Sequence, residues 1–198
     1  MPFEFEKLEI EGLILVKPKI FGDNRGRFLE SYKKSDFVKA GIDSEFLQDN
    51  NSVSAKNVLR GLHYQVYPEM QAKLVRCTRG RIYDVAVDLR PDSKTFKKSL
   101  KVELSGENQR MLYIPEGFAH GFVVLSDEAE LSYKTTKEFS LVCERGLLWC
   151  DKEINVDWGI DFEPILSEKD KVQPAFDEIN KEELLCQKDC LSQVEQVS

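Results

Sequence analysis

The 198-residue sequence lacks any long apolar run. None approaches the roughly 18 residues that a membrane-spanning helix needs. The first residues, MPFEFEKLEIEG, are acidic, whereas a secretory signal peptide begins with a basic segment. We therefore expect a cytoplasmic protein with no membrane partner. Its length predicts one domain of ordinary size, and its 41% hydrophobic and 32% charged residues are typical of a globular chain.

The sequence has fewer basic than acidic residues. The chain has 28 Lys and Arg against 35 Asp and Glu, a formal net charge of −7. The electrostatic field of this net negative charge repels polyanions, which argues against a nucleic-acid partner. An anionic ligand would therefore need a local basic pocket.

Cysteine and histidine are scarce, and neither has the spacing of a metal site. The cysteines are odd in number and form no CxxC pair, which argues against a disulfide framework or a structural zinc ion and favours reduced thiols. Only two histidines, His63 and His120, are present, and they form no HxH pair. The five cysteines are Cys77, Cys143, Cys150, Cys186 and Cys190.

Short strand-like runs separated by glycine and proline fill most of the chain. In RIYDVAVDLR (81–90), side chains alternate between a face with Tyr83, Val85 and Val87 and a face with Asp84 and Ala86. So many strands without helices between them predict an antiparallel sandwich or barrel.

A helical pattern is confined to two segments. The first is 35–41, with Ser35 as the candidate N-cap and Gly41 at its end. The second is the polar tail, which has no strand pattern and is interpreted as either a docked helix or a frayed end. We accordingly divide the chain into a domain over residues 1–175 and a C-terminal extension over 176–198.

The heptapeptide LRGLHYQ (59–65) holds the first histidine within an apolar stretch. Strict alternation would put Arg60 and His63 on opposite faces of a strand, but Gly61 between them permits a bulge that re-aims one side chain. Both could then point inward. Alone, such a histidine would more often be a core residue with one hydrogen bond.

The sequence resembles the dTDP-4-dehydrorhamnose 3,5-epimerase family across residues 12 to 174. Motifs occur in that family's order and spacing, which makes the likeness far more specific than one short motif. They are FGDNRGRFLESY, QDNNSVSAKNVLRGLHYQ, QAKLVRCTRGRIYDVAVDLRPDSKTF, IPEGFAHGFVVLS, ELSYKTT and PILSEKD.

The resemblance implies an all-β fold, a double-stranded β-helix of the cupin type, with short peripheral helices. It also implies a homodimer without cofactor or metal. The implied reaction inverts C3 and C5 of dTDP-4-dehydro-6-deoxy-D-glucose and gives dTDP-4-dehydro-L-rhamnose. It removes a proton next to the C4 ketone and returns one from the opposite face.

Four catalytic residues follow from the resemblance, and each meets a need of this chemistry. His63 matches the base, since imidazole has a pKa near 6.5. Asp170 matches the carboxylate that orients it. Lys73 matches the cation that stabilises the enolate oxygen. Tyr133 matches the acid on the opposite face; without the resemblance it would be interpreted as a buried core aromatic.

Further matches concern substrate binding. His120 is expected near Asp84, as a binding residue or a second dyad. Phe139 stands where many family members have a tyrosine that stacks on thymine; phenylalanine can still stack, so this departure bears on nucleotide preference. The other expected binding residues are Arg25, Phe28, Glu30, Gln48, Asp49, Asn50, Arg60, Glu144 and Lys169. An arginine fork suits phosphate oxygens, whereas Glu144 and Lys169, taken singly, would be interpreted as solvated surface charges.

Three alternatives remain open. A metal-dependent cupin would need three or four ligands, usually with an HxH pair, which this chain lacks. A catalytically inactive sugar-binding module would be expected to have lost the base, the acid or the lysine. An enzyme that inverts a single carbon, or that acts on another nucleotide-linked sugar, would use the same acid and base.

Overall fold

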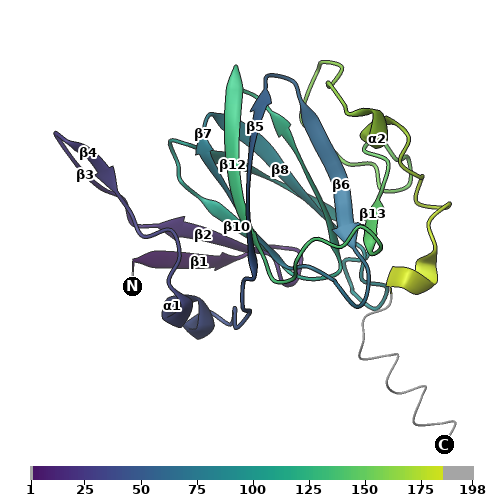
Figure 1. Cartoon of the computed structure of the whole chain (residues 1–198), viewed down its shortest axis with the longest axis horizontal. Coiled ribbons are helices and arrows are strands. Elements are labelled where there is room, and N and C mark those ends of the chain that lie inside the picture. Colours follow the sequence, from purple (N-terminus) through teal and green to yellow (C-terminus); the bar gives the residue numbers. More distant parts are fainter. Residues whose placement is uncertain (1, 185–198) are drawn as a thin grey trace, which may run out of the picture.

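The computed structural model describes residues 2–184. Two antiparallel sheets face each other and enclose the interior of a barrel (Figure 1). The first sheet has six strands, each antiparallel to its neighbours. Their spatial order is β1 (Phe3–Lys7), β2 (Ile14–Pro18), β10 (Met111–Ile114), β7 (Lys73–Arg79), β12 (Glu128–Thr135) and β5 (Gln48–Ala55).

The second sheet has five strands and is also antiparallel. Their order is β13 (Glu144–Gly146), β6 (Leu59–Gln65), β11 (Phe118–Val124), β8 (Arg81–Asp88) and β9 (Ser99–Ser105). Neighbours in each sheet are mostly distant in sequence, as in a double-stranded β-helix. The expected cupin-type fold is confirmed.

The alternation predicted for β8 is confirmed, but both of its faces are buried. Ile82 and Ala86 face the barrel interior, among the apolar side chains of the opposite sheet. Val85 and Val87 face outward and are covered by a cluster that includes Trp158. The loops after β13 supply this cover, so the five-stranded sheet has a core on each side.

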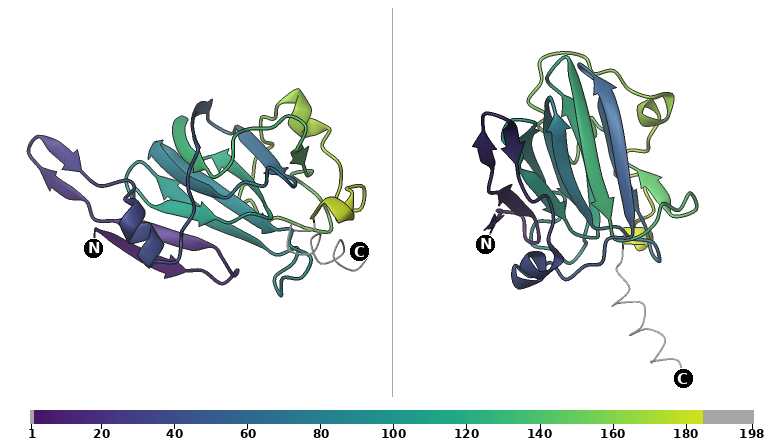
Figure 2. Two further views of the ribbon diagram at one scale, coloured as in Figure 1. Left: turned by 60° about the horizontal axis from the view of Figure 1, so that its bottom comes forward. Right: turned by 60° about the vertical axis from the view of Figure 1, so that its left-hand side comes forward.

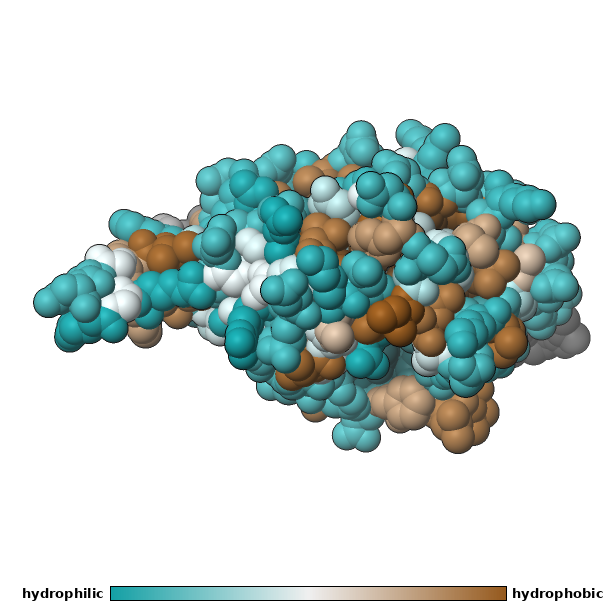
Figure 3. Space-filling model, turned by 90° about the horizontal axis from the view of Figure 1, so that it is seen from above, coloured by the Kyte–Doolittle hydropathy of each residue, from teal (hydrophilic) through white to brown (hydrophobic). Residues whose placement is uncertain are grey.

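A small two-stranded hairpin near the N-terminus stands apart from the barrel. It consists of β3 (Phe21–Asp23) and β4 (Gly26–Phe28). Figure 1 shows it projecting from the end of the molecule opposite α2 (Glu168–Lys171). Figure 3 shows it as a narrow arm with a hydrophilic tip and apolar patches behind the tip.

The first helix begins one residue before the predicted N-cap. Helix α1 spans Lys34–Lys39, and its N-cap is Lys33, which has extended backbone and no side-chain cap. Ser35 therefore lies inside the helix, and its assignment as N-cap is wrong. Burial of Phe37 against the rings of Phe3 and Phe5 fixes this helix more than its capping does. Gly41 follows it with a positive φ, as its place at the end predicted.

The described part of the C-terminal extension docks on the barrel, beside β13 (Figure 2). Phe176 is fully buried, Leu184 is 5% exposed, and a 3-10 helix spans Lys181–Leu184. Residues 185–198, with Cys186, Cys190 and the rest of the expected tail helix, lie outside the described residues. In the part of the chain that is described, no helix has the length and apolar character needed to cross a membrane.

Candidate active site

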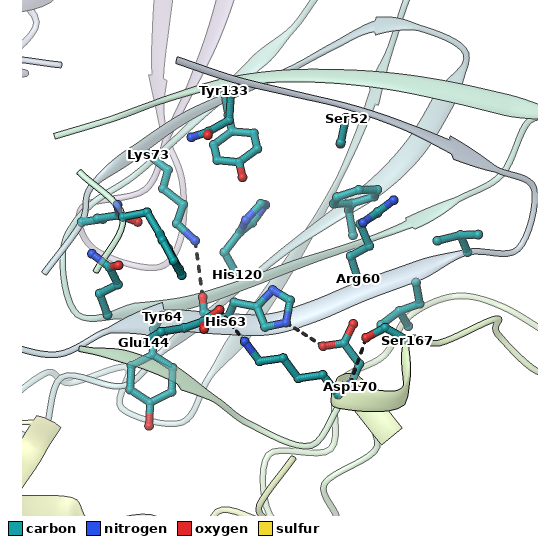
Figure 4. A pocket seen from close by; sticks show the side chains of 18 of the residues that line it. Ser52, Arg60, His63, Tyr64, Lys73, His120, Tyr133, Glu144, Ser167 and Asp170 are labelled. Carbon is teal, nitrogen blue, oxygen red and sulfur yellow. Dashed lines mark hydrogen bonds and ion pairs between the residues drawn. The ribbon is translucent and has the colours of Figure 1, made fainter. Parts of the chain in front are cut away.

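A pocket of about 620 Å³ opens into the barrel interior between the two sheets. All four residues matched to catalytic roles line it: His63, Lys73, Tyr133 and Asp170. They come from β6, β7, β12 and α2, which are far apart in the sequence (Figure 4).

A bulge in β6 turns both Arg60 and His63 towards this pocket, as the sequence allowed. Strand β6 pairs with β11 at His63 and His120, and again at Arg60 and Phe122. Two residues of β6 therefore lie opposite one residue of β11. Gly61, in the bulge, has a φ of 127°, and a Cβ atom there would lie 2.9 Å from the carbonyl oxygen of His120.

His63 forms a short hydrogen bond with a buried carboxylate. Its Nε2 atom lies 2.6 Å from Oδ1 of Asp170, which is 2% exposed. Ser167 caps α2 by accepting the Asp170 N–H, which fixes this residue. Burial alone would raise the pKa of Asp170, but the hydrogen bond and charge of His63, with Ser167 and the Gly61 N–H, lower it below its usual value. The other ring nitrogen of His63 faces the cavity (Figure 4).

Lys73 provides a buried ammonium group in the same pocket. The residue is 8% exposed, and Nζ donates to the His63 carbonyl at 3.4 Å. Burial lowers the pKa of Lys73 to about 8, against the attraction of Asp84 and Glu144. At neutral pH the group is still mostly charged.

His120 and Asp84 form a second pair, which is buried at the wall of the pocket. Nε2 of His120 lies 2.8 Å from Oδ1 of Asp84, which is fully buried. Burial lowers the pKa of His120, and the nearby Asp84 carboxylate opposes this. This pairing agrees with the resemblance, while the role of the dyad stays a prediction.

Tyr133 points into the pocket from the opposite sheet (Figure 4). Burial raises the pKa of this phenol above its usual value, and the positive charge of Arg60 partly opposes the rise. Tyr133 therefore stays protonated at neutral pH and has a proton to donate.

Most of the residues expected to bind substrate also line the pocket. Glu144 and Lys169 form an ion pair of 2.5 Å at its edge. Phe139 is 56% exposed. The matched residues in this lining are Gln48, Asn50, Arg60, His120, Phe139, Glu144 and Lys169.

Asp49 is an exception, because it lies on the outer face of β5. Its neighbours Gln48 and Asn50 line the pocket, and strand alternation turns Asp49 away, where it forms an ion pair of 2.8 Å with Lys134.

Arg25, Phe28 and Glu30 do not line the pocket of their own chain. Arg25 lies in the turn of the projecting hairpin, with its side chain 85% exposed and paired with Asp23 at 2.6 Å. Phe28 is 66% exposed. Glu30 follows the hairpin.

Sequence reasoning missed five polar residues of the pocket, which are Ser52, Tyr64, Gln65, Gln71 and Ser167. Ser52 lines it, and its hydroxyl is buried without a hydrogen-bond partner. Alternate residues of a strand face the same side, so Ser52 could have been predicted from Gln48 and Asn50. Ser167 also lines the pocket, and the Ser-x-x-Asp spacing with Asp170 is a capping pattern that could have identified it.

A carboxylate-oriented imidazole, a buried ammonium and a phenol around one cavity are the groups of an isomerase that moves protons on carbon. The family model for dTDP-4-dehydrorhamnose 3,5-epimerase matches residues 7–178. The chain belongs to the dTDP-4-dehydrorhamnose 3,5-epimerase family.

Individual relatives agree with this assignment. A dTDP-4-dehydrorhamnose 3,5-epimerase of Shigella flexneri is 56% identical over 165 residues, which cover 83% of this chain and 91% of the relative. A crystal structure of the dTDP-6-deoxy-D-glucose-3,5-epimerase of Legionella pneumophila, in complex with dTDP-4-keto-L-rhamnose, has a TM-score of 0.88 and 41% identity over 91% of this chain and 96% of that one. ChmJ, a 3'-monoepimerase of Streptomyces bikiniensis in complex with dTDP-quinovose, has a TM-score of 0.86 and 32% identity over 97% and 98%.

Proposed function

We propose that this protein epimerises dTDP-4-dehydro-6-deoxy-D-glucose at C3 and C5 and produces dTDP-4-dehydro-L-rhamnose. The observation that carries the proposal is the contact between His63 and Asp170, 2.6 Å long, in one pocket with Lys73 and Tyr133. Family membership supports the same substrate class.

His63 acts as the base. In its neutral form the nitrogen bonded to Asp170 carries the proton, so the other nitrogen has a lone pair towards the cavity. It takes a proton from the carbon next to the C4 ketone, and the electrons of that C–H bond move to the C4 oxygen. Asp170 stabilises the imidazolium that results.

Lys73 and Tyr133 complete the step. The Lys73 ammonium stabilises the negative charge that develops on the C4 oxygen, an interaction that is strong in a cavity shielded from water. The Tyr133 phenol then donates its proton to the carbon from the opposite face. Proton exchange with water returns His63 and Tyr133 to their starting states, and a second round inverts the other carbon.

Arg60 and Lys169 supply local positive charge for the diphosphate in a chain whose net charge is −7. Gln48, Asn50 and Glu144 supply hydrogen bonds for the sugars, and His120, backed by Asp84, lies near the reacting carbonyl. Phe139 stacks on the base. Its lack of a hydroxyl bears on nucleotide preference.

The active form is a homodimer, in which the hairpin of each chain reaches the pocket of its partner. Three observations support this: Arg25 is exposed, it lies on an arm directed away from the barrel, and Phe28 beside it is 66% exposed. In a symmetric dimer an arm can bring Arg25, Phe28 and Glu30 to the partner's pocket. The metal-independent reaction and the cytoplasmic location stay predictions from the sequence.

A reaction in heavy water tests the proposal and separates it from inversion of a single carbon. We expect the sugar product to carry deuterium at both C3 and C5, because each inversion exchanges one carbon-bound hydrogen with solvent. Label at one carbon only would indicate a mono-epimerase. The absence of label from both carbons would contradict the proposal.

A further inference from the structure

Arg145, in β13, joins the C-terminal extension to the edge of the pocket. Its Nε and Nη2 atoms donate to the two carboxylate oxygens of Glu183 at 2.7 and 2.8 Å. Such a bidentate pair fixes the plane of the guanidinium group. Its Nη1 atom donates to the carbonyl oxygens of Val142 and Glu144 at 2.8 and 3.0 Å. One side chain thus ties Glu183 to the backbone that leads into β13.

That backbone belongs to a segment, residues 139–146, which contributes Phe139 and Glu144 to the pocket. Other contacts also hold the segment: the Phe139 and Ser140 N–H groups donate to the side-chain oxygens of Gln48 and Gln65 at 2.8 and 2.7 Å, and Cys143 is buried. None of these contacts joins it to the C-terminal extension, as Arg145 does. Among the described strands, β13 lies at the edge of its sheet and pairs only with β6. Leu141 and Val142 are 76% and 83% exposed and add little packing.

The extension holds Glu183 firmly enough to act as an anchor. The Phe176 N–H donates to Oδ2 of Asp151 at 2.8 Å, and the Phe176 ring is fully buried. Leu184, next to Glu183, is 5% exposed. Glu183 lies beyond residue 178, where the match to the family model ends.

We propose that Glu183 is a positioning residue, which acts through Arg145 to hold segment 139–146 at the mouth of the pocket. Its effect on substrate binding rests on the proposed function. Phe139 and Glu144 are assigned to binding, whereas Lys73 and Tyr133 stand on the opposite sheet. His63 stands on β6, which pairs with β13, but the central strand β11 and the bond to Asp170 hold it independently of Glu183. Loss of Glu183 therefore raises KM and leaves kcat nearly unchanged.

The test compares Glu183→Ala with Glu182→Ala in the full chain. Glu182 lies in the same 3-10 helix, but its side chain is exposed. We expect amide hydrogen exchange in residues 139–146 to be faster in Glu183→Ala only. In this variant the KM for the sugar nucleotide and the Kd for dTDP should rise roughly 3- to 30-fold, the effect of losing a charged hydrogen-bond pair. We expect kcat to stay within about twofold.

A double-mutant cycle tests whether Glu183 acts through Arg145. If it does, Glu183→Ala adds nothing to exchange or KM in an Arg145→Ala background. Equal exchange in the Glu183→Ala and Glu182→Ala variants would overturn the inference. Additive effects of the two substitutions on exchange and KM in the cycle would also overturn it. A fall in kcat as large as the rise in KM would do the same. Should the wild-type chain fail to epimerise, the proposed function fails, while the exchange data still decide the role of Glu183.

Discussion

The two histidines of this chain each contact a carboxylate through Nε2, but their surroundings differ. The His63 side chain is 34% exposed to the pocket, whereas that of His120 is 8% exposed. Burial lowers the pKa of His120. In a neutral ring whose Nε2–H donates to Asp84, the other nitrogen can only accept a hydrogen bond, for example from a sugar hydroxyl. His63 has the access to substrate that a base needs.

Loss of the positive charge of Lys73 is expected to limit activity at alkaline pH. Its pKa is lowered to about 8, and only the ammonium form stabilises the enolate. Activity is therefore present below this pKa and is lost as the pH rises through it. We expect kcat/KM to decline above about pH 8.

Asp84→Asn should move this decline to lower pH, because it removes a negative charge that favours the ammonium form of Lys73. Asp127→Asn, at a carboxylate that is 98% exposed, is the control and should leave the profile unchanged. If kcat/KM of Asp84→Asn declined at the same pH as that of the wild type, the decline would not be due to Lys73. Profiles of kcat/KM against pH for the three proteins supply the measurement.

At the scale of elements, the bulge in β6 decides which side chains reach the pocket. We expect Gly61→Ala to lower the free energy of unfolding by roughly 2–5 kcal/mol, since the added Cβ would clash with β11 and the backbone has a positive φ. Gly41→Ala is the matched control, because Gly41 also has a positive φ but has open space around it. It should cost only about 1 kcal/mol.

Denaturant unfolding of both variants measures the difference. If both variants lost the same free energy of unfolding, close packing of Gly61 against β11 would contribute little to stability.

How far local pattern predicts an element depends on what fixes that element. In β8 the period of two was sufficient to predict which face each side chain is on, because successive side chains of a strand point to opposite faces. Helix α1 was misplaced because packing of Phe37 sets its position. Strands β1, β3 and β13 were not predicted. The alternation in FEFEK was a usable signal, but β13 has only three residues and is defined by its partner β6.

The same distinction holds for the candidate site. Gly61 permits a bulge, so the residues alone allowed Arg60 and His63 both to point inward, and the structure has them so. Nothing local links His63 to Asp170, 107 positions later in the chain. The resemblance to a family supplied that pairing, and the folded chain brings the two side chains into contact.

At the scale of the whole molecule, the proposed homodimer predicts that the complete site needs two chains. We expect Arg25→Ala to raise KM although Arg25 is far from its own pocket. Mixing Arg25→Ala with His63→Ala, after unfolding and refolding together, should restore activity. Each mixed dimer then has one pocket with an intact His63 and an intact hairpin from its partner.

Assays of epimerisation in this mixture, together with the mass of the native particle, provide the measurement. Activity no higher than that of Arg25→Ala alone would indicate that the hairpin does not serve the partner's pocket. A monomeric mass would exclude the proposed assembly.

The most direct test of His63 as the base is solvent exchange at C3 and C5 in variants of the two histidines. Nuclear magnetic resonance follows the loss of both carbon-bound hydrogens of dTDP-4-dehydro-6-deoxy-D-glucose in heavy water. We predict that His63→Ala abolishes exchange at both carbons, by a factor of at least about 10². His120→Ala should slow exchange without abolishing it. Substantial exchange at either carbon in His63→Ala would contradict the account and assign the base to another group.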